Sequence, residues 1–223
     1  MKLLSMLPLL AFVLAGAVHA HQDHPKPAAD GKAAPPVAPL AKPKRDPRDY
    51  FTDRELLTQD GKKVRFYSDV LKGRTVVIGT IYTHCEDACP LILAQLNQVR
   101  LKLGDAFGKD VFFVTISSDP VRDTPQAMKG YAAKHSADVP GWIYLTGKKA
   151  DVDFILKRLG QWSENVESHS TQLIAWNFNA DRGRKMMANV PPEMLAANIM
   201  LLNGADGGIP LPSIPAAREQ SGK

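Results

Sequence analysis

The two cysteines of this 223-residue chain stand four positions apart, at Cys85 and Cys89. They lie in the segment 83–90, which reads THCEDACP, between an apolar β-branched stretch at 75–82 and a helix expected to begin at Pro90. In open α/β sheets, ligands and catalytic groups gather at the carboxyl ends of the strands. The N-terminus of a helix also lowers the pKa of a nearby thiol. This pair is therefore the first candidate for chemistry.

Three interpretations of the pair remain open. A purely structural disulfide between Cys85 and Cys89 would close a very small loop and would stabilise the fold little. A redox-active dithiol would make the two cysteines catalytic, but the usual motif has two intervening residues and this one has three. A metal site would use the two thiolates as soft ligands, and it needs at least one further ligand.

His169 is the candidate for that further ligand. It stands between Ser168 and Ser170, directly before a strand expected at about 172–178. In a thioredoxin-like sandwich, the loop before that strand packs beside the cysteine-bearing helix start. Two thiolates and one imidazole suit Cu(I) in a trigonal site, and they can hold Cu(II) with an added oxygen ligand. Structural zinc usually takes four protein ligands, so copper is the metal we expect.

Alternating strand and helix patterns fill about 160 residues around these candidates. We expect a short strand and turn at 51–61, and further strands at 75–82, 111–116, 142–145 and 172–178. We expect helices at 90–103, 125–135 and 149–159, and a last one from Pro191 or Pro192 to about 202. This order predicts an α/β sandwich with a central, mostly parallel or mixed sheet flanked by helices.

The first 20 residues have the organisation of a secretory signal peptide. Lys2 is followed by an apolar run from Leu3 to Val18 and by a small-residue cleavage pattern that ends at Ala20. We therefore expect cleavage and export, most simply to a bacterial periplasm, which is an oxidising compartment. The exported chain would be soluble, and attachment to the membrane would follow only if this segment were not cleaved.

Two low-complexity segments flank the domain expected at 50–203. Residues 21–49 are rich in proline and alanine and predict an extended linker, and residues 204–223 predict a flexible tail. Cleavage after Ala20 would place His21 and His24 near the new terminus, where they can bind Cu(II) or Zn(II), although a solvated tail is the simpler interpretation. The net charge of +5 is spread thinly and does not indicate a nucleic-acid partner.

Four groups of residues together resemble the SCO/SenC family of exported copper-binding proteins. They are the segment 82–90 with both cysteines, the segment 118–125 (SDPVRDTP), the segment 145–147 (LTG), and His169-Ser170. The resemblance covers about residues 50–203. Glu86, Ala88 and Ser168 stand where the family commonly has proline, valine and aspartate, and these departures leave the ligand positions intact.

The resemblance implies a thioredoxin-like fold. It also implies a role in delivering copper to the dinuclear copper site of cytochrome c oxidase, or in keeping the cysteines of that site reduced. Cys85, Cys89 and His169 are the implied copper ligands. The family also has an acidic residue near the metal, on the helix that follows the LTG segment. Asp153 falls in that place, with Asp151 as a less favoured substitute.

We therefore expect a copper metallochaperone rather than an enzyme, with a cuproprotein client that is a cytochrome c oxidase subunit. Asp119 and Arg122 are expected to hold the loop beside the site. The alternative hypothesis is a thiol–disulfide oxidoreductase that reduces client cysteines through Cys85 and Cys89, with metal incidental. A redox or copper sensor is a third hypothesis, for which the sequence contains no output element. Sequence alone does not separate the first two, because both need the same dithiol at the same helix start.

Overall fold

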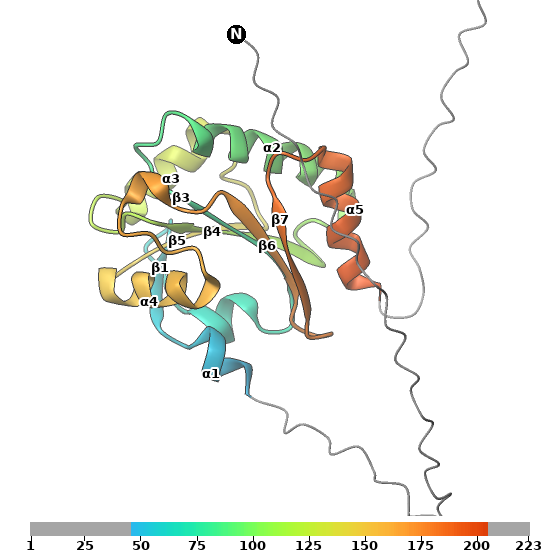
Figure 1. The fold of residues 1–223 in the computed structure, drawn as a ribbon, viewed down its shortest axis with the longest axis horizontal. Helices are drawn as coiled ribbons and strands as arrows, with labels where there is room; N and C mark the ends of the chain where they lie inside the picture. Colours follow the sequence, from blue (N-terminus) through green and yellow to red (C-terminus); the bar gives the residue numbers. More distant parts are fainter. Residues whose placement is uncertain (1–45, 205–223) are drawn as a thin grey trace, which may run out of the picture. The chain divides into compact units, whose positions relative to one another are not determined.

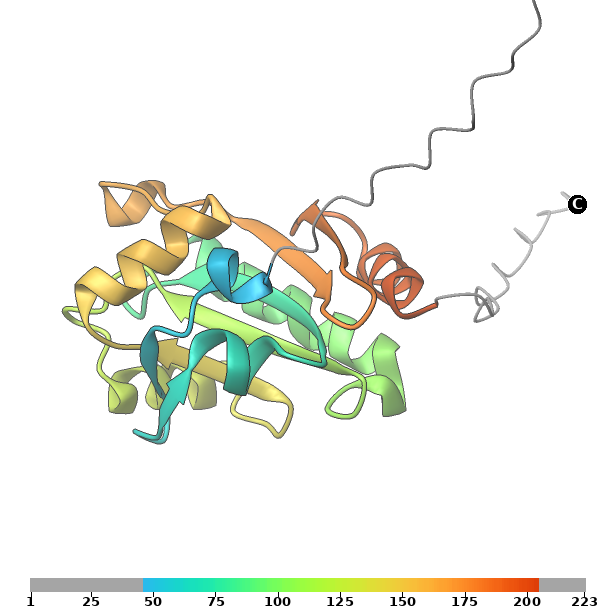
Figure 2. The same ribbon diagram turned by 90° about the horizontal axis from the view of Figure 1, so that it is seen from below.

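A computed structural model describes residues 46–204 of the chain (Figure 1). The predicted signal peptide, His21 and His24, most of the predicted linker and nearly all of the predicted tail lie outside the described residues. Within residues 46–204 the chain forms one mixed seven-stranded sheet with the strand order β2-β1-β5-β4-β3-β6-β7. Helices cover both faces of this sheet (Figures 1 and 2), so the predicted α/β sandwich is confirmed.

The strands are β1 (Glu55–Thr58), β2 (Lys63–Arg65), β3 (Thr75–Ile81), β4 (Val111–Ser117), β5 (Trp142–Thr146), β6 (Gln172–Asn177) and β7 (Arg182–Met187). The α-helices are α1 (Pro47–Phe51), α2 (Ala88–Leu103), α3 (Pro125–Lys134), α4 (Lys149–Leu159) and α5 (Pro192–Asn203). Shorter helical turns are η1 (Phe66–Leu71), η2 (Gly104–Ala106) and η3 (Val166–Ser168). Strands β3, β4 and β5 are parallel neighbours, and every other neighbouring pair in the sheet is antiparallel.

Strand β3 lies next to the middle strand of the sheet, β4, and is buried along its whole length. Val77 and Ile81 belong to the hydrophobic core beneath α2, α3 and α5, whereas Val76 and Ile78 belong to the core beneath α1 and α4. Side chains along a strand alternate between its two faces, so a strand covered on both faces needs apolar residues at nearly every position. This explains the uninterrupted apolar stretch in the sequence.

The register of the two central strands positions the cysteine segment. Strands β3 and β4 pair in parallel, with Thr75 opposite Val111 and Ile81 opposite Ser117. The segments that follow β3 and β4 therefore leave the sheet at the same edge. Helix α2 begins at Ala88, two residues earlier than the sequence predicted, so that Cys89 lies inside its first turn.

The N-terminal boundary of the domain differs from the prediction. Helix α1 begins at Pro47, so the last three residues assigned to the linker at 21–49 are helical, and Phe51 is in a helix rather than in a strand. Asp46 is the N-cap, and its side chain accepts a hydrogen bond from the backbone N–H of Arg48 at 2.9 Å. An aspartate followed by proline is a typical helix start, and the proline-rich composition around it obscured that signal.

The further elements that were not predicted include β2, η1 and β7. β2 has only three residues, and it pairs with β1 through the turn that was expected at 59–61. Of the six residues of β7, only Met186 is buried. An exposed polar edge strand lacks the alternating apolar pattern by which strands are recognised. None of the helices formed by residues 46–204 combines the length and apolar character that crossing a membrane requires.

Candidate metal centre

Cys85 lies in the loop between β3 and α2, where it acts as a cap for the helix. Its backbone N–H donates a hydrogen bond to the carbonyl oxygen of Tyr82 at 3.2 Å. Its sulfur accepts a hydrogen bond from the backbone N–H of Cys89 at 3.3 Å. The N-cap residue, Asp87, makes no capping bond with its side chain. The sulfur of Cys85 thus satisfies one of the free N–H groups at the start of α2, where partial positive charge accumulates.

The surroundings of the two thiols shift their pKa values in opposite directions. Burial alone would raise the pKa of Cys85, but hydrogen bonds from the Cys89 thiol, from the backbone N–H groups of Cys89 and Asp87, and from the Tyr82 hydroxyl lower it below its ordinary value. Burial, followed by the hydrogen bond with Cys85, raises the pKa of Cys89. Burial and the same hydrogen bond to Cys85 raise the pKa of Tyr82 to about 12. Of the two thiols, Cys85 therefore loses its proton more easily, and Cys89 and Tyr82 act as its hydrogen-bond donors.

His169 reaches the cysteine pair from the other side of the site. It follows η3 and precedes β6, and its Nε2 atom lies 3.7 Å from the Sγ atom of Cys89. Its Nδ1 atom lies 3.0 Å from the carbonyl oxygen of Ser170. A carbonyl oxygen only accepts hydrogen bonds, so Nδ1 carries the proton and the lone pair of Nε2 faces the sulfur.

Burial also keeps the imidazole of His169 neutral. Only 8% of the His169 side chain is exposed, and the Tyr82 ring packs edge-on against it with 5.6 Å between the ring centroids. Desolvation lowers the pKa of His169, and the hydrogen bond with Ser170 offsets this only in part. A neutral imidazole with a free Nε2 lone pair is the form that binds a metal ion.

A pocket of about 490 Å³ opens onto these residues. Tyr82, Cys85 and His169 line it together with three carboxylates, those of Glu86, Asp87 and Glu167, and with His84, Ala88 and Thr171. Cys89 is completely buried and does not line the pocket. Both cysteines are free thiols. A group that enters from solvent on this side therefore meets Cys85 and His169 first.

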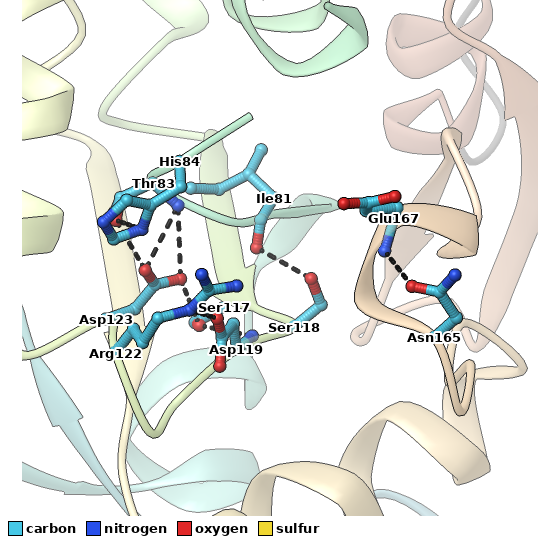
Figure 3. Close-up of polar contacts among 10 residues, drawn as sticks. All are labelled: Ile81, Thr83, His84, Ser117, Ser118, Asp119, Arg122, Asp123, Asn165 and Glu167. Carbon is cyan, nitrogen blue, oxygen red and sulfur yellow. Dashed lines mark hydrogen bonds and ion pairs between the residues drawn. The ribbon is translucent and has the colours of Figure 1, made fainter. Parts of the chain in front are cut away.

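A buried carboxylate fixes the start of the cysteine loop. Asp123 accepts hydrogen bonds from the Thr83 hydroxyl at 2.6 Å, from the Thr83 backbone N–H at 3.1 Å, and from the Ser117 hydroxyl at 2.6 Å (Figure 3). Asp123 has no exposed surface. An ionised side chain in such a place needs several donors, and these come from β4 and from the loop two residues before Cys85. Asp123 thereby ties the cysteine loop to the neighbouring strand.

Asp119 and Arg122, which were expected to hold the loop beside the site, belong to the same hydrogen-bond network. Arg122 donates a hydrogen bond to the carboxylate of Asp119, and the backbone N–H of Asp119 donates to the Ser117 hydroxyl at 2.9 Å. The backbone N–H of Ser118 donates to the carbonyl oxygen of Ile81 at 2.8 Å, and the Ser118 hydroxyl also contacts that oxygen (Figure 3). The loop after β4 is therefore bonded directly to the end of β3.

The structure brings together three of the four predicted metal ligands. Cys89 contacts both Cys85 and His169, and the latter two line the same pocket, whereas the Asp153 carboxylate pairs with Lys149 on α4 and does not line it. The less favoured Asp151 pairs with Arg54 at 2.5 Å. Over residues 46–204, no three or more His, Cys, Asp and Glu side chains already stand close enough to ligate one ion together. Asp123 belongs to the segment 118–125 that carries the family resemblance, and its partner Thr83, which lies 40 residues away, was not predicted.

Comparison with known proteins supports the family suggested by the sequence. The family model SCO1/SenC matches residues 42–177. The SCO1 protein homologue of Bacillus subtilis is 35% identical over 104 residues, which cover 46% of this chain and 52% of that protein. The chain thus spans about half the length of the curated relatives it matches.

Two solved structures extend the likeness to the fold. The copper-bound structure of ScoI from Bradyrhizobium japonicum is 27% identical with a TM-score of 0.56, and the match covers 66% of this chain and 96% of that one. The structure of BsSco, described as having a disulfide switch and as a member of the Sco family of cytochrome c oxidase assembly proteins, is 25% identical with a TM-score of 0.57. That match covers 67% of this chain and 90% of the other. The predicted thioredoxin-like sandwich is confirmed.

Proposed function

The chain belongs to the SCO1/SenC family, and from that premise we propose that it binds one copper ion through Cys85, Cys89 and His169 and delivers it to a client protein. The proposed client is the subunit that carries the dinuclear copper site of cytochrome c oxidase, or a similar cuproprotein. The descriptions of two relatives support this proposal, one as a copper-bound protein and the other as a cytochrome c oxidase assembly protein.

The position of His169 is the observation that carries the proposal. Its Nε2 lone pair faces the Sγ atom of Cys89 at 3.7 Å, and its proton is held on Nδ1 by the Ser170 carbonyl. Cys85 adds a second sulfur whose pKa is already lowered. Two thiolates and a neutral imidazole are soft ligands that suit copper, and metal binding requires them in their deprotonated forms.

The surroundings of the site also favour capture and release of a cation. Glu86, Asp87 and Glu167 give the pocket an acidic lining that attracts positive charge. Of the two sulfurs, only that of Cys85 borders the pocket. Cys85 is therefore the sulfur ligand that a client's ligands replace first when copper is handed over, and Cys89 remains sealed beneath it.

Copper titration of the full chain tests this proposal. We expect one copper ion per chain, and we expect Cys85→Ser, Cys89→Ser and His169→Ala each to weaken binding by at least roughly tenfold, because each removes one ligand. Asp60→Asn is the control, since that exposed carboxylate pairs with Lys129 and does not line the pocket. Tight copper binding at the domain by the double Cys85→Ser, Cys89→Ser variant would contradict the proposal.

A thiol–disulfide oxidoreductase is the second candidate function. The contrast between Cys85, with a lowered pKa, and the sealed Cys89 suits an attacking and a resolving thiol. Such a protein would pass two electrons from its dithiol to a client disulfide, giving a client dithiol and a Cys85–Cys89 disulfide. Mixing the copper-loaded chain, and separately the reduced copper-free chain, with the client's copper-site domain shows whether metal or electrons move. Full activity of His169→Ala would favour the reductase.

Export of the chain belongs to the same proposal. The signal-like segment at 1–20 supports it, and a chain that acts on a copper site outside the cytoplasm has to be exported. The compartment we propose is the bacterial periplasm. Fractionation of cells that express the full chain, with the N-terminus of the product sequenced, tests both the location and the cleavage after Ala20.

A further inference from the structure

Cys85 also borders a second pocket, on the side of the cysteine loop that faces the end of α3. This pocket has a volume of about 450 Å³ and lies between the loop and the C-terminal end of α3. Besides Cys85, its lining includes Tyr131, Lys134 and His135. His169 and Cys89 do not line it. Cys85 is thus the one sulfur of the pair that meets either pocket, and it can be approached from two directions.

The two pockets differ in charge. Three carboxylates line the pocket beside His169, and no lysine or arginine lines it. The second pocket shares only Glu86 with that set, and Lys134 offsets its charge. Lys134 forms no salt bridge with any residue of the described part of the chain. A cation is therefore favoured on the His169 side, and an anion meets less repulsion beside Lys134.

Tyr131 lines the second pocket and carries an unused hydrogen-bond donor. Its side chain is only 6% exposed, and among residues 46–204 its hydroxyl has no hydrogen-bond partner. Burial raises the pKa of Tyr131, and the charges of Cys89 and Cys85 raise it further, so the hydroxyl keeps its proton. A buried hydroxyl without an acceptor is available to a ligand that accepts its hydrogen bond.

We infer that the second pocket binds the sulfur group that exchanges with Cys85, and that it binds this group as a thiolate. Tyr131 donates a hydrogen bond to the thiolate sulfur, and the ammonium of Lys134 faces its negative charge. Copper and the exchanging thiolate then reach Cys85 through different pockets. The inference rests on the proposed function, because it names the route by which a client cysteine or a small thiol takes part in that chemistry.

Exchange with a small disulfide makes the step explicit. The Cys85 thiolate attacks one sulfur of the disulfide, the disulfide's S–S bond breaks, and the first thiolate leaves. Cys89, after losing its proton to solvent, attacks the sulfur of Cys85 in the mixed disulfide and displaces the second thiolate. Two electrons pass from the protein dithiol to the small disulfide, which yields two small thiols and one Cys85–Cys89 disulfide. In the proposed geometry the departing thiolates occupy the pocket beside Tyr131 and Lys134.

The charge preference of this reaction tests the inference. The reduced, copper-free full chain is mixed with 3,3′-dithiodipropionate, which is anionic, or with cystamine, which is cationic, and the rate of thiol loss is measured. Rates for the chain unfolded in urea correct for the intrinsic reactivity of each reagent. We expect the folded chain to favour the anionic reagent by roughly tenfold at low salt, and the preference to shrink as salt screens the charges.

Matched variants locate the effect. Lys134→Ala should abolish most of the preference for the anionic reagent. Lys109→Ala removes the same charge just before β4, at a residue that does not line the second pocket, and it should leave the preference unchanged. Tyr131→Phe should slow both reagents by roughly five- to tenfold, because a thiolate loses a charge-assisted hydrogen bond. The unfolding free energy of Tyr131→Phe, measured in parallel, shows whether this variant folds normally. The inference is overturned if Lys134→Ala leaves the preference intact, if Lys109→Ala has an equal effect, or if Glu167→Gln moves the preference instead.

One further measurement distinguishes a protein thiolate from a small thiolate, and another distinguishes the thiolate pocket from the proposed copper function. Peptides in which glutamates or lysines flank one cysteine are applied as mixed disulfides, and they represent a protein client. Their rates are compared with those of small thiols of the same charge. Both kinds of reagent must show the charge preference that depends on Lys134. Copper titration of the unaltered chain reports on the proposed function alone. Copper binding without the charge preference would overturn the second pocket, and the preference without copper binding would overturn the copper function.

Discussion

The sulfur atoms of Cys85 and Cys89 have different surroundings, although only three residues separate them in the chain. Cys85 receives hydrogen bonds at the start of α2 and borders both pockets, whereas Cys89 has no exposed surface. The difference follows from the helix boundary. Cys85 lies before the N-cap and Cys89 lies inside the first turn, where its side chain enters the core.

Alkylation of the reduced chain should distinguish the two thiols. Because the pKa of Cys85 is lowered and that of Cys89 is raised, iodoacetamide should modify Cys85 first, and its rate should stay high below the pH at which an ordinary thiol loses reactivity. Peptide mass spectrometry after short exposures from pH 6 to 9 measures this. In Cys85→Ser the remaining thiol should react only slowly. Equal labelling of both cysteines would contradict the assignment.

Replacement of Asp123 should loosen the cysteine loop. In Asp123→Asn the amide group would face the donors of Thr83 or Ser117, so at least one buried hydrogen bond is lost, at a cost of about 2–4 kcal/mol in the free energy of unfolding. Urea unfolding of the copper-free chain measures the cost. Asp60→Asn is the control, because it breaks only an exposed ion pair with Lys129 and should cost less than about 1 kcal/mol. Equal effects of the two substitutions would contradict the role given to Asp123.

Single residues also show what the sequence made predictable at the site. His169 was found because a histidine directly before a strand, in this type of sandwich, lies beside the helix that carries Cys85 and Cys89. Asp123 gave no such signal. It stands in the segment 118–125, and its partner Thr83 lies 40 residues earlier, so only the pairing of β3 with β4 brings the two together.

At the scale of elements, burial decided which ones the sequence revealed. β3 is buried on both faces and was predicted from an uninterrupted apolar stretch. β7 is an exposed edge strand with the sequence RGRKMM. It was not predicted, because a strand with a single buried residue has no alternating apolar pattern. Likewise, α1 has only five residues, and its start lies within a proline-rich segment. The central sheet and its long helices were therefore predictable, whereas the short and exposed elements were not.

Two glycine substitutions test the packing of these elements. A Cβ atom at Gly183 in β7 would collide with the indole of Trp176 on β6, so Gly183→Ala should lower the free energy of unfolding by about 1–3 kcal/mol. Gly130 lies inside α3, where a Cβ atom meets nothing within 4 Å, so Gly130→Ala should raise it by about 0.5–1 kcal/mol. Chemical denaturation measures both. Effects of the same sign would show that local packing does not decide them.

At the scale of the whole molecule, the candidate ligands join distant parts of the chain. His169 lies 80 residues after Cys89, and the two meet only in the folded domain. An ion bound to the folded state but not to the unfolded one stabilises the fold by about 4 kcal/mol when its free concentration is a thousand times Kd. We therefore expect copper to raise the unfolding temperature of the full chain in proportion to the logarithm of its concentration.

The control for this effect is Cys85→Ser, in which copper should shift the unfolding temperature little. Scanning calorimetry at several free copper concentrations, held with a buffering ligand, measures the shift in both chains. A shift of the same size in the variant would place the stabilising copper elsewhere on the molecule.

The two edges of the sheet restrict how copies of this protein can meet. On one side the sheet ends with β2, which is three residues long, and on the other with β7, which carries Arg182, Arg184 and Lys185. A strand of a second copy that paired with β7 would bring its own positive charges beside these three, which resists association edge to edge. Growth of the sheet into chains of molecules is therefore discouraged at both ends. Cys85 and its two pockets lie beyond the carboxyl end of β3, an interior strand, and not at either edge of the sheet.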